Sequence, residues 1–184
     1  QNRYNDIYLV NKFFTWTNEL IPNKFKDLTN DHPRMVIPFR DANSKIFAYQ
    51  GRAFGKEQPK YITIVLDQNQ KKIFGLDRVD NNRNIIIVEG PIDSFFLPNC
   101  IAVAQGDLRL PQYKGKSTLV FDNEPRNREI IKNIEKAIEE DYSVVIWPED
   151  IKEKDINDMI VGGMTNLEIS NIIHNNTFSG LQAK

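Results

Sequence analysis

Residues 85–93 read Ile-Ile-Ile-Val-Glu-Gly-Pro-Ile-Asp, and this stretch decides the fold. Four consecutive β-branched residues predict a short strand that is buried on both faces, as strands of parallel sheets are. Glu89 follows the strand directly, and Asp93 falls in the first turn of the helix that Pro91 favours. Because open α/β sheets bind ligands beyond the carboxyl ends of their strands, this turn is a candidate site. An ordinary strand-to-helix turn with an exposed acid explains the stretch equally well.

The second half of the chain continues as strands that alternate with helices. Apolar strands are predicted at residues 100–104, 118–121 and 143–147. An amphipathic helix follows Pro125, and shorter helices are predicted at residues 155–161 and 166–173. Such alternation indicates parallel pairing through right-handed crossovers. We therefore expect an α/β fold with a mostly parallel four-stranded sheet flanked by helices, and a poorly ordered tail beyond His174.

The first half has a different pattern, which predicts a small mixed α+β subdomain. Apolar side chains at roughly helical spacing over residues 4–20 predict a packing helix, and residues 71–79 predict a short one. Strands are predicted at residues 35–39, 46–54 and 61–66. The expected domains are a basic subdomain over residues 1–84, the α/β domain over residues 85–162, and a C-terminal helix and tail over residues 163–184.

Length and composition limit the class of protein. A chain of 184 residues can hold one domain with a core, or a domain with a small appended module. No apolar run approaches the ~20 residues needed to cross a bilayer, and no cleaved signal is visible, so we expect a cytoplasmic protein without a membrane partner. The single Cys100 excludes an internal disulfide and a cysteine zinc site within these residues. A start at Gln1 rather than Met suggests a piece of a longer protein.

Charge is unevenly distributed, although the formal net charge is only −1. Residues 1–84 hold 14 Lys and Arg against 9 Asp and Glu, a net of +5, whereas residues 85–184 hold 10 against 16, a net of −6. A basic half beside an acidic half suits a polyanion held next to metal-binding carboxylates. A solvated surface of uneven charge is the commoner cause, so charge alone does not identify nucleic acid as the ligand.

Acidic residues follow three of the predicted parallel strands. Glu89, Asp122 and Glu124 would stand at one edge of the sheet, with Asp155 and Asp158 on a helix start near it. Acids gathered there would repel one another, and hard divalent ions such as Mg²⁺ prefer oxygen ligands, so the pattern predicts a metal site. Each acid also has a structural explanation. Asp155 and Asp158 match an N-cap with an acid at the third helical position, which is the preferred explanation for that pair, and Glu124 can serve the dipole of the following helix.

Three basic residues fall at the ends of the strands in the first half. Arg40 closes the first strand, Arg52 lies near the end of the second, and Lys60 precedes the third, so we expect them within a short distance of one another. Surface Lys and Arg side chains more often serve solubility than function, and that explanation is the commoner one here.

The acidic motifs at residues 89–93, 122–124 and 154–158 together resemble the TOPRIM domain shared by topoisomerases, bacterial-type primases and some nucleases. The basic motifs Val-Ile-Pro-Phe-Arg-Asp, Tyr-Gln-Gly-Arg and Pro-Lys-Tyr, which begin at Val36, Tyr49 and Pro59, resemble the segment that precedes TOPRIM in bacterial-type DNA primases, especially those of tailed phages. Each motif is moderately specific, whereas their order and spacing together are strongly so.

The resemblance implies template-directed synthesis of short RNA primers from ribonucleoside triphosphates on single-stranded DNA. It implies that Mg²⁺ or Mn²⁺ is held by Glu89, Asp122 and Glu124, with the acidic cluster completed by Asp93, Asp155 and Asp158. It also implies contacts to triphosphate or template phosphates from Arg40, Arg52 and Lys60, with Lys60 among the catalytic residues. The implied partners are the single-stranded DNA template, ribonucleoside triphosphates and a replicative helicase.

Two departures from the family pattern and three alternatives stay open. The second acidic motif of the family usually reads Asp-x-Asp, whereas Glu124 here is longer by a methylene. The cysteine zinc module and the helicase domain of many relatives are absent from these residues. A TOPRIM nuclease would use the same acids to activate water, and a non-catalytic module would bind single strands without metal. A topoisomerase is the least favoured class, because it needs a tyrosine nucleophile that has no candidate base here.

Overall fold

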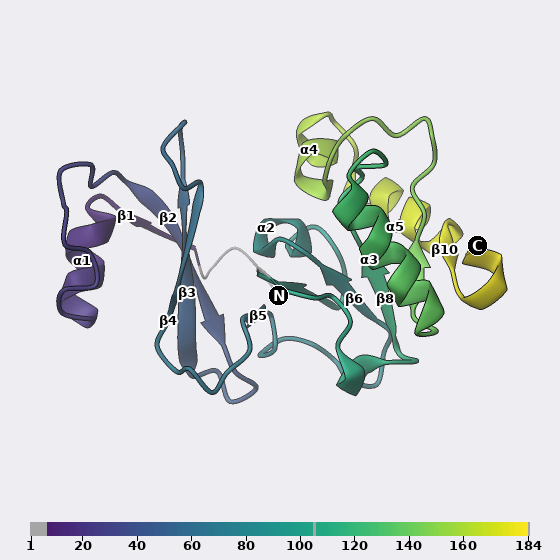
Figure 1. Ribbon diagram of the computed structural model, residues 1–184, viewed down its shortest axis with the longest axis horizontal. Helices are drawn as coiled ribbons and strands as arrows, with labels where there is room; N and C mark the ends of the chain where they lie inside the picture. Colours follow the sequence, from purple (N-terminus) through teal and green to yellow (C-terminus); the bar gives the residue numbers. More distant parts are fainter. Residues whose placement is uncertain (1–6, 105, 184) are drawn as a thin grey trace. The chain divides into compact units, whose positions relative to one another are not determined.

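Figure 1 shows the computed structural model, which describes residues 7–104 and 106–183. The chain divides into two units, Gln1–Lys72 and Ile73–Lys184, each with its own buried core. Among the described residues, no helix is both long enough and apolar enough to pass through a bilayer.

The described part of the first unit is a four-stranded antiparallel sheet with one helix packed on it. In spatial order its strands are β1 (Tyr8–Val10), β2 (Arg34–Arg40), β3 (Ile46–Ala53) and β4 (Tyr61–Val65). Helix α1 (Phe13–Leu20) buries Phe13 in a core with Val36, Tyr49 and Ile64 of the sheet. The three strands predicted at residues 35–39, 46–54 and 61–66 are confirmed as β2, β3 and β4.

The predicted helix over residues 4–20 is wrong in its first part. Residues 8–10 form β1, α1 begins only at Phe13, and residues 4–6 lie outside the described residues. β1 pairs with β2 along an edge that would otherwise expose unpaired main-chain groups. Residues 8–10 therefore form a strand, because the main-chain hydrogen bonds to β2 favour it, although the spacing of the apolar side chains is helical.

In the described part of the second unit, six strands form one sheet in the order β10-β9-β8-β6-β7-β5. The four central strands are parallel, namely β6 (Ile85–Val88), β7 (Cys100–Val103), β8 (Ser117–Val120) and β9 (Ser143–Val145). They are the four strands that the sequence predicts, and the α/β class is confirmed. The edge strands β5 (Ile73–Phe74) and β10 (Thr177–Phe178) run antiparallel to their neighbours, so the sheet is mixed.

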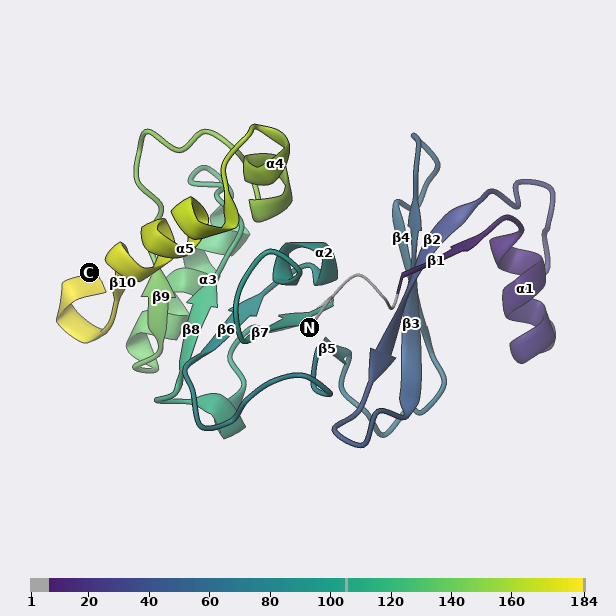
Figure 2. The same cartoon turned by 180° about the vertical axis from the view of Figure 1, so that it is seen from behind.

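Helices cover both faces of this mixed sheet (Figures 1 and 2). One face is covered by α3 (Arg128–Glu139), whose Ala137 and Ile138 join a core with Ile85 and Ile87. The other face carries α2 (Pro91–Ser94), α4 (Ile156–Val161) and α5 (Asn166–Asn175). The remaining elements are the short 3-10 turns η1 (Pro111–Tyr113) and η2 (Gly180–Ala183). Cover on both faces explains why all four residues of β6 are buried.

Two predictions for the second unit are wrong. Residues 71–79 do not form a helix but contain β5, whose Ile73 pairs with Val103 of β7. This pairing carries the chain into the second sheet, so the units divide after Lys72 rather than after residue 84. The tail beyond His174 contains β10, which pairs with β9. β5 and β10 have two residues each, which is too short to show a periodic pattern. Each is a strand because it pairs with a strand at the edge of the sheet.

Candidate metal and nucleotide site

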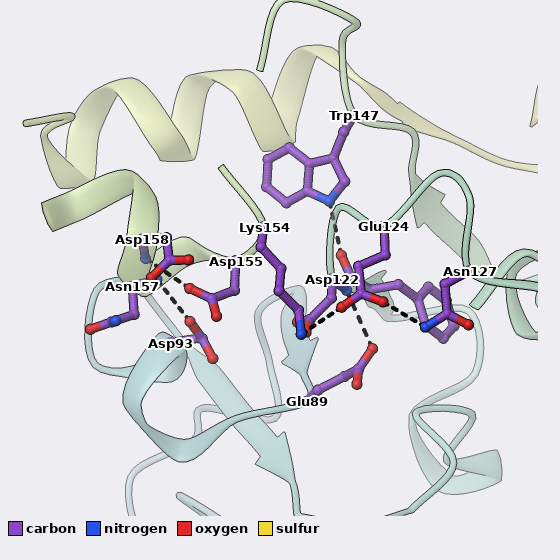
Figure 3. Close-up of polar contacts among 11 residues, drawn as sticks. Glu89, Asp93, Asp122, Glu124, Asn127, Trp147, Lys154, Asp155, Asn157 and Asp158 are labelled. Carbon is purple, nitrogen blue, oxygen red and sulfur yellow. Dashed lines mark hydrogen bonds and ion pairs between the residues drawn. The ribbon is translucent and has the colours of Figure 1, made fainter. Parts of the chain in front are cut away.

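Parallel pairing brings the predicted acids to the carboxyl edge of the mixed sheet. Val88 of β6 lies opposite Val120 of β8, so the residues that follow the two strands are neighbours. Glu89 Oε1 accepts a hydrogen bond from the main-chain N–H of Asp122 at 3.3 Å. Figure 3 shows Glu124 beside this pair, with the remaining acids on the far side of Lys154. The common edge is therefore present, while the role of each acid stays a prediction.

Four of these carboxylates line one small cavity, and we call them the inner acids: Glu89, Asp93, Asp122 and Asp155. The cavity has a volume of about 10 Å³, which is room for one water-sized group. Gly90 allows Asp93 to come this close, because a Cβ at residue 90 would lie 2.4 Å from Asp93 Oδ2. The turn that follows β6 thus needs a glycine, because any larger side chain at residue 90 would clash with Asp93.

Burial raises the pKa of three inner acids. It raises the pKa of Asp122 to about 7, with further increases from the negative charges of Glu89, Asp93 and Asp155. Burial also raises the pKa of Asp93 to about 6, although the main-chain N–H of Asn157 donates to Asp93 Oδ1 at 2.9 Å and opposes the shift. The pKa of Glu89 is raised for the same main reason. A divalent cation in the cavity would remove this electrostatic cost.

Glu124 stands apart from the inner acids. Its Oε2 accepts a hydrogen bond from Asn127 Nδ2 at 2.5 Å, and its Oε1 lies 2.5 Å from Lys154 Nζ. The Asn127 hydrogen bond and then the Lys154 contact lower the pKa of Glu124. The same ammonium lies 3.9 Å from Asp122 Oδ2, so Lys154 reaches from Glu124 toward the inner acids (Figure 3).

A larger polar hollow opens beside the inner cavity. It has a volume of about 580 Å³, in the range of pockets that hold small molecules. Its lining includes Glu89, Asp122, Glu124, Asn127 and Lys154. The hollow therefore offers carboxylates for a cation and an ammonium for an anion within one space.

Asp155 and Asp158 begin α4 in the way that the capping explanation predicts. Asp155 is the N-cap, and its Oδ1 accepts a hydrogen bond from the main-chain N–H of Asp158 at 2.7 Å. Asp158 is exposed on the first turn, where an acid complements the helix dipole. Capping is confirmed for this pair, and Asp155 combines it with a place in the inner cavity.

The chemistry of the inner acids fits a hard divalent ion. In the described ranges, no three His, Cys, Asp or Glu side chains stand close enough together to grip one ion as they are placed. The donors are nevertheless all carboxylate oxygens around a cavity of ionic size, and a side-chain ammonium already lies at the charged edge. Mg²⁺ and Mn²⁺ favour such oxygen donors, and Mg²⁺ keeps several waters, so its site needs only a few protein carboxylates.

Sequence reasoning missed the residues that hold the loop before α4 in place. The main-chain N–H of Asn123 donates to Lys154 O at 2.6 Å, and its side-chain Nδ2 donates to Ile151 O and Glu153 O at 3.0 and 3.1 Å. Lys154 belongs to one of the acidic motifs, but the sequence predicts no role for it or for Asn123. The sequence signal for this role is an asparagine between two acids, because its side-chain amide can donate hydrogen bonds to the main chain of a neighbouring loop.

The three basic residues of the first unit do not gather at one point. Arg40 lies opposite Ile46 at the hairpin end, where its Nη1 donates to Ser44 O at 3.0 Å, whereas Arg52 lies opposite Met35. The two positions are five residues apart along β2, about 17 Å at the rise of an extended strand. The expectation that all three lie within a short distance is therefore wrong for Arg40, because antiparallel pairing puts strand ends at opposite sides of the sheet.

Arg52 and Lys60 do lie together, around one tyrosine. The Arg52 guanidinium carbon is 5.9 Å from the centre of the Tyr61 ring, and its Nε donates to Tyr61 Oη at 3.2 Å. Lys60 Nζ is 5.6 Å from the same centre. Two cations beside an aromatic ring form a surface suited to phosphates and bases of a single strand.

Arg34 is a second residue that sequence reasoning missed. It is only 1% exposed, and its Nη1 donates to the main-chain carbonyls of Gly51, Pro59 and Lys60 at 3.3, 3.0 and 3.3 Å. Burial lowers the pKa of Arg34. Arg34 thus fixes the segment that carries Lys60 against β3. Arginine is usually at the surface, so the sequence gives little sign of a buried one.

Comparison with solved structures shows that the chain has the fold of DNA primase catalytic domains. The crystal structure of the Aquifex aeolicus primase (zinc binding and RNA polymerase domains) matches with a TM-score of 0.64, at 20% identity over 94% of this chain and 51% of that one. The structure of a DnaG primase catalytic domain bound to ssDNA matches with a TM-score of 0.60, at 18% identity over 81% of this chain and 55% of that one. No family model matches the chain.

In sequence, the DNA primase of Enterobacteria phage T4 is 36% identical over 189 aligned residues. The alignment covers 100% of this chain and 55% of that protein, so the chain spans about half the length of its relative. The predicted resemblance to DNA primases is thereby confirmed, and the similarity to the phage protein extends over the whole chain.

Proposed function

We propose that this chain is the catalytic core of a primase, which makes short RNA primers from ribonucleoside triphosphates on single-stranded DNA. The observation that carries the proposal is the set of half-buried inner acids at the carboxyl edge of the parallel strands, in a chain 36% identical to a phage DNA primase. Assignment of the second unit to the TOPRIM class is part of the proposal. It is supported by the order of the acidic motifs and by the parallel pairing of β6 with β8.

Glu89 and Asp122 would be the main holders of Mg²⁺ or Mn²⁺, with Asp93 and Asp155 completing the inner cavity and Glu124 lining the outer hollow. A bound divalent ion supplies charge neutralisation at the triphosphate and lowers the pKa of the attacking 3′-hydroxyl. The protein shields the inner acids partly from solvent, which strengthens their attraction for a cation. Asp158, exposed on α4, would act on the ion only through water.

The basic side chains of the first unit are assigned to phosphates. Arg52 and Lys60 flank Tyr61, so this cluster could hold the triphosphate or template phosphates while the ring stacks on a base. Lys60 is the one counted as catalytic. Arg40, at the other end of the sheet, is assigned to the template strand. The known complex of a DnaG primase catalytic domain with ssDNA supports a single-stranded template, and a replicative helicase is a further proposed partner.

The proposal is tested by primer synthesis. Purified protein with Mn²⁺, the four ribonucleoside triphosphates and single-stranded DNA is expected to yield short RNA, measured by gel electrophoresis of labelled product. Glu89→Gln keeps the size of the side chain but removes a half-buried charge, and we expect product to fall by at least about 100-fold, the scale on which loss of a transition-state stabilising group acts. Glu149→Gln changes an exposed acid in the loop before α4 and is the matched control.

Each alternative function gives a different result in the same assay. Cleavage of the DNA strand without incorporation of ribonucleotide would select the nuclease. Binding of single strands with no metal-dependent activity would select the non-catalytic module. Equal primer yield from wild type and Glu89→Gln would overturn the assignment of the inner acids.

A further inference from the structure

Lys154 places a positive charge where the proposed cation site meets the outer hollow. Its Nζ lies 2.5 Å from Glu124 Oε1 and 3.9 Å from Asp122 Oδ2. The two acids on which it acts are both in the predicted set of metal ligands. One side chain of the protein thus already performs part of the charge neutralisation that a divalent ion would provide.

The backbone of Lys154 is fixed, whereas its side chain is not enclosed. Asn123 binds the carbonyl of Lys154 and those of Ile151 and Glu153, so the loop is held at the acidic edge. The Lys154 side chain is 55% exposed. An ion pair with that exposure is weak and readily broken, and the long aliphatic stem lets the ammonium move without the loop.

We propose that the Lys154 ammonium is an internal counter-cation that competes with the divalent ion for Glu124 and Asp122, so that metal binding releases Lys154 into the outer hollow. The proposal rests on the proposed function only in requiring that the site binds a divalent ion. Once released, the ammonium would remain beside the hollow of about 580 Å³ that it lines and could pair with a nucleotide phosphate there.

This proposal explains why residue 124 is a glutamate, which is one methylene longer than the aspartate of the usual motif. A longer side chain can reach both Asn127 and Lys154 in the absence of metal, and its contacts to them are both 2.5 Å. Glu124 would then exchange an ammonium for a divalent ion. The proposal therefore accounts for the residue at which this chain departs from the usual motif.

The first test measures metal affinity. Lys154→Gln removes the competing charge, so the dissociation constant for Mn²⁺, measured by titration calorimetry without nucleotide, is expected to fall about three- to tenfold, the scale of one unit charge a few ångströms away near a protein surface. Lys152→Gln makes the same charge change on the same loop and is the matched control, expected to alter affinity less than twofold. Lys154→Arg keeps the charge and is expected to bind Mn²⁺ no more tightly than wild type.

The second test observes release of Lys154 directly in the wild-type protein. Acetylation of lysine amines by a dilute active ester, followed by mass spectrometry, is expected to modify Lys154 faster when Mn²⁺ is present. Lys152, exposed on the same loop, serves as the internal reference and is expected to react at an unchanged rate.

The outcomes separate this proposal from the proposed function. Equal Mn²⁺ affinity of wild type and Lys154→Gln, or acetylation of Lys154 that metal does not change, would show that the ion pair is structural and would overturn the exchange. Failure of every variant and of the wild type to bind Mn²⁺ would overturn the metal site itself, and the exchange with it.

Discussion

Asp122 has the highest pKa value found for an acid of the site. Its side chain is 23% exposed and lies beside three other acids, and partial burial and these charges raise its pKa from 3.8 to about 7. The folded protein therefore binds a proton between these two pH values that the unfolded chain releases. Because the folded-state pKa is the higher one, the stabilisation due to Asp122 is present below pH 3.8 and is lost as the pH rises through about 7.

Because the pKa of Asp122 is higher in the folded state, the metal-free protein should lose stability as the pH rises. In EDTA, the free energy of unfolding of wild type is expected to decrease from pH 5 to pH 8. Each pKa unit by which folding raises the pKa of a carboxyl group corresponds to about 1.4 kcal/mol of stability, which is lost once the pH exceeds the raised pKa. Asp122→Asn cannot ionise, so its stability should depend less on pH and should exceed that of wild type at pH 8. Urea unfolding at several pH values measures both.

The control for Asp122→Asn is Asp150→Asn, which changes an exposed acid in the loop before α4. It is expected to leave the pH profile of wild type unchanged. Added Mn²⁺ should stabilise the wild type most at pH 8, which lies above the raised pKa values of Asp93 and Asp122. Parallel profiles for wild type and Asp122→Asn would contradict the raised pKa of Asp122.

Among the elements, those that carry long apolar runs were the predictable ones. The β-branched run of β6 and the strands that follow it predicted four parallel strands, and pairing of β6 with β7 and β8 bears this out. The strands that were missed, β1, β5 and β10, have three, two and two residues. Such segments carry no periodicity, and each becomes a strand because an open sheet edge offers main-chain partners.

The candidate site was predictable to the same extent. Acids directly after strands, such as Glu89 and Asp122, were found because parallel pairing fixes where strand ends meet. Lys154, Asn123 and Arg34 were missed, because their roles depend on contacts to loops distant in sequence. Residue type predicts a surface position for each of them, which holds for the exposed Lys154 but not for Arg34, which is 1% exposed.

Packing of α1 depends on Gly51 of β3. A Cβ on this residue would lie 2.4 Å from Cε2 and 2.5 Å from Cζ of the Phe13 ring, and Phe13 is 0% exposed. Gly51→Ala is therefore expected to displace α1 and to destabilise the first unit by about 1–3 kcal/mol, the usual cost of overpacking a core. The urea-unfolding midpoint measures the effect.

Gly55→Ala is the matched control for Gly51→Ala. Its Cβ would meet only the flexible end of the Glu57 side chain, which can move aside. It is expected to change stability by less than about 0.5 kcal/mol, as substitutions at the surface usually do. A loss of stability as large as that of Gly51→Ala would argue against the role of the Phe13 contact.

Over the whole molecule, the two structural units have opposite charge. Division after Lys72 leaves 12 Lys and Arg against 7 Asp and Glu in the first unit and 12 against 18 in the second, still +5 and −6. The charge asymmetry is therefore a property of the folded units rather than of the point at which the sequence is divided. It suits a first unit that holds a polyanion and a second unit that holds cations.

Binding of single-stranded DNA should accordingly depend on salt through the first unit. The logarithm of the association constant is expected to fall linearly with the logarithm of salt concentration. The double variant Arg52→Ala/Lys60→Ala should reduce the slope by up to about 1.4, or about 0.7 for each phosphate that is no longer neutralised. Fluorescence anisotropy of a labelled oligonucleotide measures both quantities.

The double variant Lys24→Ala/Lys26→Ala removes the same charge from exposed positions in the connector after α1 and serves as the control. It should weaken binding slightly and leave the slope nearly unchanged. Equal slopes for wild type and Arg52→Ala/Lys60→Ala would mean that the cluster around Tyr61 does not bind phosphates.

The last strand has a consequence for the solubility of shortened versions of this protein. Thr177 and Phe178 of β10 pair with Val145 and Val144 of β9 and so occupy the outer side of that strand. A chain that stops before residue 177 would leave β9 as a bare apolar strand, free to recruit the same strand from another copy. Loss of residues 177–184 would then convert a monodisperse preparation into one that self-associates, even though every proposed ligand and every α-helix of the second unit is still encoded.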